Sequence, residues 1–254
     1  MISMDQLLAN QVMLITGAGS AIGRKTASLL AQAGAKIVAA DVPGLALTVT
    51  VNDLTTAGFT AIAVPTNVLN PAAVRALLTT TIHHFGRLDG LINHAGAMTP
   101  LISPETFGDK LWDQVTTTHT ASVTTVTREV LPYFARQHHG VIVNVATVGQ
   151  LTSDQTETAY TAAKRAITTL TKKLANRAAT NGIRVNAITP GNIQADIVEP
   201  LRVRRAQEAG GLEVATRTSN EIAQTTLFLA TNQASDVNGV IVSVDKGWTS
   251  SIRP

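Results

Sequence analysis

The chain has 254 residues, of which 44% are apolar and 15% are charged, a composition that allows a large buried core and is untypical of disordered chains. Its formal net charge of +3, without a long basic tract, argues against nucleic-acid binding, and the absence of cysteine excludes disulfides and thiolate metal sites. Apolar runs are too short to span a membrane, and the first residues, MISMDQLLANQ, lack a signal-peptide pattern. We therefore expect a cytoplasmic protein with no membrane association.

Short aliphatic segments alternate along the chain with segments of helical spacing. The expected strands cover residues 12–16, 36–41, 60–66, 88–94, 140–146, 184–189 and 239–245. Most are too continuously apolar to have a solvent-exposed face. The stretch PAAVRALLTTTIHHF, residues 71–85, has a proline in the first turn of an expected helix. This alternation predicts a parallel sheet covered by helices on both faces, as one domain over residues 1–254.

Residues 192–216 follow neither the strand period nor the helix period, so we expect them to cover the substrate site. Arg202, Arg204 and Arg205 in this segment either attract an acidic substrate or acyl-carrier-type partner, or form a solvated helix face, which is the commoner case. The histidine pairs 83–84 and 138–139 do not predict a metal site, because neighbouring helical residues point in different directions.

A glycine-rich turn, TGAGSAIG, follows the first expected strand at residues 16–23. Gly17 and Gly19 permit a tight turn, and Gly23 allows the following helix to approach the sheet. The N–H groups at the start of that helix can then bind a pyrophosphate. A glycine turn alone is a weak signal, but its position after the first strand strengthens it.

Asp41 ends the second expected strand. A carboxylate at this place can accept hydrogen bonds from the hydroxyls of an adenosine ribose and repels a 2′-phosphate, which favours NAD over NADP. The alternative is an ordinary turn aspartate in DVPG. Because the glycine turn and the acid agree, ribose binding is the preferred interpretation.

Tyr160 and Lys164 are four residues apart in an expected helix, on one face. A nearby ammonium lowers the pKa of a phenol, which makes the phenol a usable proton donor and acceptor. Thr147, thirteen residues before the tyrosine, could hold a substrate oxygen while a nicotinamide delivers hydride to the carbon. Taken alone, a Tyr–Lys pair is more often a solvated helix face.

These motifs together resemble the short-chain dehydrogenase/reductase family over nearly the whole chain. The matching segments are TGAGSAIG, NHAG at 93–96, YTAAK at 160–164, RVNAITPG at 184–191 and DKGW at 245–248. The resemblance implies a Rossmann fold, NAD(P)-dependent oxidation of alcohols or reduction of carbonyls, and a homotetramer. It assigns catalysis to Thr147, Tyr160 and Lys164. It assigns cofactor binding to the glycine turn, the strand ends and the catalytic pair, namely Gly17, Ser20, Ile22, Gly23, Asp41, Asn67, Val68, Asn93, Ala95, Gly96, Tyr160, Lys164, Pro190, Gly191 and Ile193.

Departures from the family pattern include Ala21, a tolerated variant of the glycine turn, and four positions that bear on catalysis or cofactor contacts. Thr147 replaces the family's serine and keeps a hydroxyl, and His119 replaces the asparagine of its proton relay. His119 either serves in that relay or is a histidine packed in a helix interface. Asn67 replaces the acid that meets the adenine amino group, and its carbonyl can still accept that hydrogen bond. Ala195 replaces a threonine that contacts the carboxamide, with the loss of one hydrogen bond.

Two functional hypotheses follow. The first is an NAD-dependent oxidoreductase acting on a small alcohol or ketone, with Tyr160 as the acid/base. The second is a dinucleotide-binding protein with little or no catalysis, acting as a sensor or as a subunit of a mixed oligomer. The substitutions motivate the second hypothesis, and the retained Tyr160, Lys164 and glycine turn favour the first.

Overall fold

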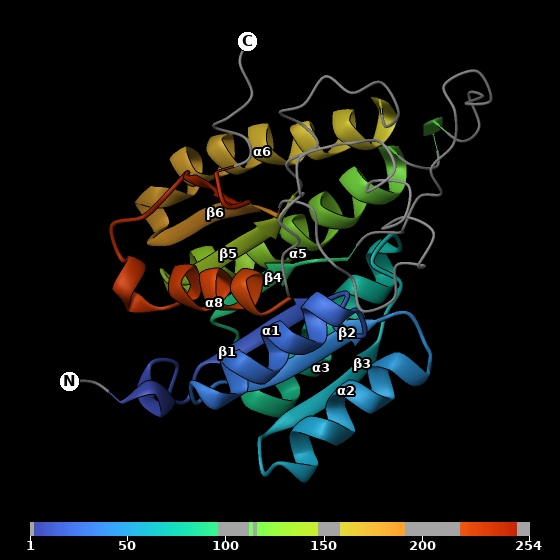
Figure 1. Cartoon of the computed structure of the whole chain (residues 1–254), viewed down its shortest axis with the longest axis vertical. Coiled ribbons are helices and arrows are strands. Elements are labelled where there is room, and N and C mark those ends of the chain that lie inside the picture. The colour runs from blue at the N-terminus through green and yellow to red at the C-terminus, as the bar shows by residue number, and fades with distance from the viewer. Residues whose placement is uncertain (1–2, 96–111, 114–115, 147–157, 191–218, 248–254) are drawn as a thin grey trace.

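A seven-stranded sheet forms the centre of the molecule (Figure 1). The computed structural model describes residues 3–95, 112–113, 116–146, 158–190 and 219–247. All neighbouring strands pair in parallel, in the order β3-β2-β1-β4-β5-β6-β7. The strands are β1 Val12–Thr16, β2 Lys36–Asp41, β3 Ala61–Pro65, β4 Gly90–Asn93, β5 Gly140–Val145, β6 Ile183–Pro190 and β7 Ile241–Val244. This confirms the predicted doubly wound Rossmann fold, with its switch point between β1 and β4.

Helices cover both faces of the sheet (Figure 1). The first face carries α1 Ala21–Gln32, α2 Leu45–Thr56 and α8 Ser219–Ala230. The second carries α3 Pro71–Phe85, α5 Ser122–Gln137 and α6 Thr158–Ala178. Short helical turns are η1 Met4–Gln6, η3 Thr117–Ala121, η5 Ala179–Asn181 and η6 Asn232–Ala234. Among the described helices, none combines the length and the apolar character that crossing a membrane requires.

Alternate residues of β1 supply two separate cores, as expected for a strand buried on both faces. Met13 and Ile15 belong to the cluster under α1, α2 and α8. Val12 and Leu14 belong to the cluster under α3, α5 and α6. All five residues of β1 are buried, which is why the strand is a continuous aliphatic run.

Local sequence signals set the ends of α3 where they were predicted. Asn70 caps the helix, with its side-chain oxygen accepting hydrogen bonds from the backbone N–H groups of Ala72 and Ala73. Gly86 ends it in the left-handed conformation, with φ of 76°. The last strand, in contrast, begins at Ile241 rather than at residue 239, because Gly239 has φ of 78° and cannot continue a strand.

Asp89 joins several elements at the amino ends of the strands. Its buried carboxylate accepts a hydrogen bond of 2.8 Å from the N–H of Val12, the first residue of β1. Arg87 donates to both of its oxygens, and this contact raises the pKa of the Arg87 guanidinium. His139 Nε2 lies 3.6 Å from the same carboxylate, just before β5. The strand expected at 88–94 covers only Gly90–Asn93 in the structure, directly after Asp89.

Candidate cofactor and catalytic site

The glycine turn lies between the end of β1 and the start of α1, at the switch point of the sheet. Gly17 has φ of 69° and packs so closely on the end of β4 that an added Cβ would lie 2.9 Å from the nitrogen of Ala95. A Cβ on Gly23 would collide with the carbonyl oxygen of Gly17. Both glycines are therefore required by close backbone contacts.

Ser20 begins α1 as its N-cap. Its hydroxyl accepts a hydrogen bond of 3.0 Å from the N–H of Gly23 and donates one of 2.8 Å to the carbonyl of Gly17. Ile22, next to Gly23, is buried against the sheet core. The first turn of α1 contains no acidic residue. The positive end of the helix dipole at this turn is thus suited to a phosphate group.

Asp41, at the end of β2, contacts the glycine turn directly. Its Oδ2 accepts a hydrogen bond of 2.8 Å from the N–H of Gly19, and its Oδ1 accepts one of 2.8 Å from the N–H of Val42. A Cβ on Gly19 would lie 3.1 Å from Oδ2, so glycine at this position permits the approach. Each oxygen keeps a lone pair, which leaves a fixed, half-buried carboxylate able to accept further hydrogen bonds.

The end of β4 is held against the same turn by Thr16. Its buried hydroxyl accepts hydrogen bonds of 3.2 Å from the backbone N–H groups of His94 and Ala95. The imidazole of His94 lies with Nδ1 3.1 Å from Ser20 Oγ. Asn93 is buried and ends the strand. The NHAG segment is therefore connected to the glycine turn through both its backbone and a side chain.

Asn67 and Val68 follow β3 at the carboxyl edge of the sheet. Asn67 is exposed, and its side-chain oxygen accepts a hydrogen bond of 3.0 Å from the N–H of Leu69. The Asn67 side-chain oxygen, which was expected to accept from an adenine amino group, thus already accepts one hydrogen bond and keeps one lone pair. Val68 is half-buried and packs against the core on the α3 side.

His119 lies in η3, a π-helical turn that leads into α5. It is 3% exposed, and its carbonyl accepts a hydrogen bond of 3.2 Å from the Ser122 hydroxyl. The same hydroxyl is also 3.2 Å from the carbonyl of Ala95, which ties this turn to the end of β4. Single π-helical turns often occur at functional sites. The position predicted to replace the relay asparagine therefore lies beside the NHAG segment.

Tyr160 and Lys164 lie in the first half of α6, as predicted, although their side chains lie outside the described part of the chain. Pro190 is the buried last residue of β6. Several predicted site residues lie outside the described residues, namely Gly96, Thr147, Gly191, Ile193 and Ala195. The expected covering segment 192–216, with Arg202, Arg204 and Arg205, lies outside them as well.

This donor set fits a dinucleotide. An anion-binding helix start, a fixed carboxylate at the end of β2 and a β4 end packed on the turn lie together at the switch point. These are the groups that would hold a pyrophosphate and a ribose. Among the described residues, no cluster of three His, Asp or Glu could hold a metal ion.

Comparison with known proteins identifies the family. A family model described as enoyl-(acyl carrier protein) reductase matches residues 17–249. The chain is 35% identical to 3beta-hydroxysteroid dehydrogenase 2 of Eggerthella lenta, with 97% of each chain covered. The chain belongs to the short-chain dehydrogenase/reductase family. Cyclohexanol dehydrogenase of Acinetobacter sp. is 32% identical, covering 97% of this chain and 98% of the relative. A crystal structure of levodione reductase superposes with a TM-score of 0.89 at 32% identity, covering 96% of this chain and 100% of that one.

As a short-chain dehydrogenase/reductase, the chain belongs to a family of oxidoreductases that use a nicotinamide dinucleotide.

The tertiary structure adds contacts around the glycine turn that the motifs did not indicate. Thr16 and His94 hold the β4 end, and Thr50 of α2 donates a hydrogen bond of 3.0 Å to the carbonyl of Ala18 in the glycine turn. Thr16 is the first residue of the TGAGSAIG motif, so the sequence offered a signal for its role. Thr50 lies in a helix with no pattern that points to the turn.

Proposed function

We propose that this short-chain dehydrogenase/reductase is an NAD-dependent enzyme that interconverts a small alcohol and its carbonyl compound. The observation that carries the cofactor choice is the Asp41 carboxylate, anchored by the N–H of Gly19 beside the anion-binding start of α1. Its negative charge would repel a 2′-phosphate while its remaining lone pairs accept ribose hydroxyls. By their names, the relatives act on a hydroxysteroid, on cyclohexanol and on levodione. These names support an alcohol or ketone substrate.

The catalytic roles in this proposal follow from residue chemistry and from membership of the family. The nicotinamide, when bound, supplies or accepts the hydride. Tyr160 donates a proton to the carbonyl oxygen during reduction and accepts it during oxidation. Lys164 favours the phenolate and would hold the nicotinamide ribose. Thr147 holds the substrate oxygen through its hydroxyl.

The proposed cofactor site uses the groups described above. The glycine turn at Gly17, Ser20 and Gly23 would hold the pyrophosphate, with Asp41 on the adenosine ribose. Residues after β3 and β6 would contact the adenine and the nicotinamide. We also propose that the protein is a cytoplasmic homotetramer, on the basis of family membership.

Replacement of the proposed acid tests this function. Tyr160→Phe removes one hydroxyl, so turnover with NAD and cyclohexanol should fall by about 10²–10⁴-fold, the usual contribution of a positioned acid/base. NADH affinity, measured by calorimetry, should stay nearly unchanged. Tyr133→Phe is the matched control, because Tyr133 lies on α5, where its ring faces Arg136. That variant should retain full activity.

Two outcomes would oppose the proposal. Equal turnover of the Tyr160→Phe variant and the unmodified protein would show that another group is the acid. NADH binding without turnover on any tested alcohol or ketone would instead favour the non-catalytic dinucleotide-binding hypothesis, which the His119 and Ala195 substitutions motivate.

A further inference from the structure

A continuous set of buried hydrogen bonds connects β4, β5, α5 and α6 below the carboxyl edge of the sheet. Asn93 Nδ2 donates to Asn144 Oδ1 at 2.9 Å and to Thr127 Oγ1 at 3.1 Å. Asn144 Nδ2 donates to Thr171 Oγ1 at 2.9 Å, and the Thr171 hydroxyl donates to the carbonyl of Ile167 at 2.8 Å. We call these four side chains, Asn93, Thr127, Asn144 and Thr171, the amide network. All four are at most 2% exposed.

The amide network lies between two apolar clusters. Leu91 and Ile142, two residues before Asn93 and Asn144 on the same strands, belong to the core under α3, α5 and α6. Towards the carboxyl edge, Ala146 packs with Val123 of α5 and Ile167 of α6. Apolar side chains would fit this position without the cost of burying amides, so stability alone does not explain polar residues here. Asn93 Oδ1, moreover, is buried and accepts no hydrogen bond from the described residues.

Position along α6 relates the amide network to the proposed catalytic residues. Thr171 follows Lys164 by seven residues and Tyr160 by eleven, so the three positions share one face of the helix. At Ile167 and Thr171, which are both 0% exposed, α6 is buried, and Thr171 contacts Asn144 of β5. Asn144 lies in β5, one residue before its last residue Val145, and precedes Thr147 by three residues in the sequence. The Asn144–Thr171 hydrogen bond is therefore a direct link between the strand that leads to Thr147 and the helix that carries Tyr160 and Lys164.

Hydrogen bonds restrict the position and rotation of a packed helix more narrowly than apolar contacts do. Aliphatic side chains tolerate small sliding or rotation of a helix, whereas an amide-to-hydroxyl bond has a narrow range of distance and angle. In a reaction that needs the acid and the substrate oxygen in close register, a shift of about 1 Å can reduce the rate about 10²-fold. A buried bond between β5 and α6 is a suitable device for holding that register.

We propose that Asn144 and Thr171 are positioning residues that hold α6 in catalytic register on β5. The inference rests on the proposed roles of Tyr160, Lys164 and Thr147. The two residues touch neither substrate nor cofactor, and they act through the placement of the helix. Their loss should lower kcat while leaving KM and NADH affinity little changed.

The test compares threonines that differ in one contact. Thr171→Val removes the hydroxyl and keeps the shape, and Thr171→Ser keeps the hydroxyl. The matched control is Thr81→Val on α3, because Thr81 is also 0% exposed and also donates to the carbonyl four residues earlier, at 2.8 Å. In the described residues, Thr171 differs from Thr81 by accepting the Asn144 amide. Thr171→Ala is a second variant that places no extra methyl group against that amide.

Thr171→Val and Thr171→Ala should lower kcat about tenfold or more, since small displacements of reacting groups have effects of up to about 10²-fold. Thr81→Val should keep its kcat even if its urea midpoint falls as far as that of Thr171→Val. Thr171→Ser should keep most of the activity of the unmodified protein. Amide hydrogen exchange over residues 158–167 should accelerate in the Thr171 variants and stay unchanged in Thr81→Val.

Unchanged exchange over residues 158–167 would overturn the inference, as would equal kcat losses in Thr171→Val and Thr81→Val at equal stability. The exchange measurement needs no turnover. An inactive unmodified protein would therefore contradict the proposed function, while the exchange result would still decide whether the amide network holds α6.

Discussion

At the scale of single residues, the proposed preference for NAD depends on the charge and the anchoring of Asp41. Asp41→Ser removes the charge and the hydrogen bond from the N–H of Gly19. NADH affinity should fall about tenfold or more, because a hydrogen bond to a charged group contributes about 1.5–3 kcal/mol. NADPH affinity should not fall, because repulsion of the 2′-phosphate is also removed. Calorimetric titration with each cofactor measures both effects.

The control for this prediction is Asp53→Ser, which removes an exposed carboxylate from α2. It changes the net charge equally and should leave both affinities unaltered. Tighter binding of NADPH than NADH by the unmodified protein would contradict the role given to Asp41.

At the scale of secondary-structure elements, Asp89 ties the amino ends of β1 and β4 together with Arg87. Asp89→Asn should lower the free energy of unfolding by about 2 kcal/mol, the contribution typical of hydrogen bonds to a charged group, because Val12 and Arg87 lose a charged acceptor. NADH affinity should persist, since these contacts lie at the end of the strands opposite the glycine turn. Urea unfolding measures the change.

Glu129→Gln provides the comparison at this scale. Glu129 pairs with Arg75 at 3.2 Å, and the Arg75 side chain is 59% exposed. Exposed pairs contribute about 0–1 kcal/mol, so this variant should be nearly as stable as the unmodified protein. An equal loss in both variants would show that burial of Asp89 adds nothing to its contacts.

At the scale of the whole molecule, cofactor binding should stabilise the fold, because the glycine turn joins β1, β2, β4 and α1 in one site. NADH at one hundred times its Kd should add about 2.7 kcal/mol to the free energy of unfolding. This corresponds to a rise in Tm of roughly 5–10 °C for a chain of this size. Differential scanning calorimetry measures it.

NADPH at the same concentration should raise the Tm less, and Asp41→Ser should reduce the NADH effect. An unchanged Tm with NADH would contradict dinucleotide binding.

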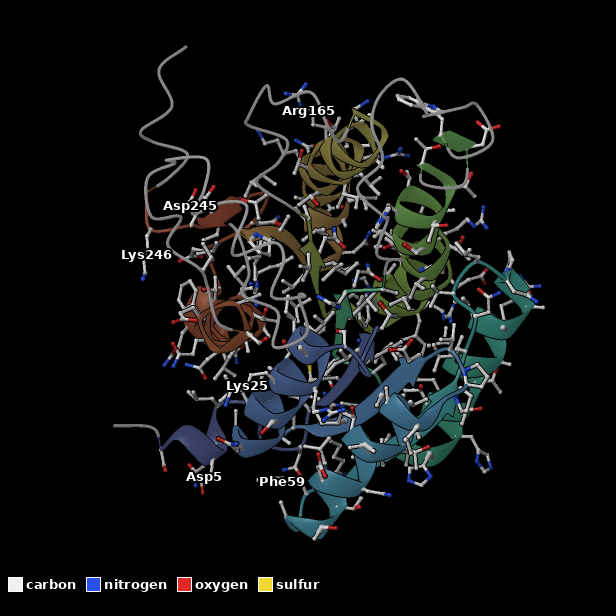
Figure 2. The ribbon with its side chains drawn as sticks, turned by 45° about the vertical axis from the view of Figure 1, so that its right-hand side comes forward. Asp5, Lys25, Phe59, Arg165, Asp245 and Lys246 are labelled. Atoms are coloured by element: carbon white, nitrogen blue, oxygen red, sulfur yellow. The ribbon has the colours of Figure 1, made fainter. Side chains whose placement is uncertain are left out.

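A hydrogen-bonded turn follows β7. Figure 2 shows Asp245 and Lys246 close together there, and Asp245 Oδ1 accepts a hydrogen bond of 2.9 Å from the N–H of Gly247. This turn lies in the DKGW segment that, together with the other motifs, resembles the family.

The sequence by itself determined the seven strands, the glycine turn and the family, because hydrophobic period, glycine positions and short motifs are local properties of the chain. It also identified Asp41 as the acid after the second strand. The starts of β4 and β7, at Gly90 and Ile241, each differ from the prediction by two residues. The binding and catalytic roles of the named residues remain predictions that the variants above test.

Only the tertiary structure decided which distant groups meet. Gly19 contacts Asp41, Ser20 contacts His94, and Asn144 contacts Thr171. The motifs and periods of the sequence do not state these side-chain contacts, because each contact depends on the order of strands in the sheet and on which helix packs over them. A threonine hydroxyl that completes a long-range hydrogen bond, such as that of Thr171, looks in the sequence like any other helical threonine. Its partner is set by the packing of α6 on β5.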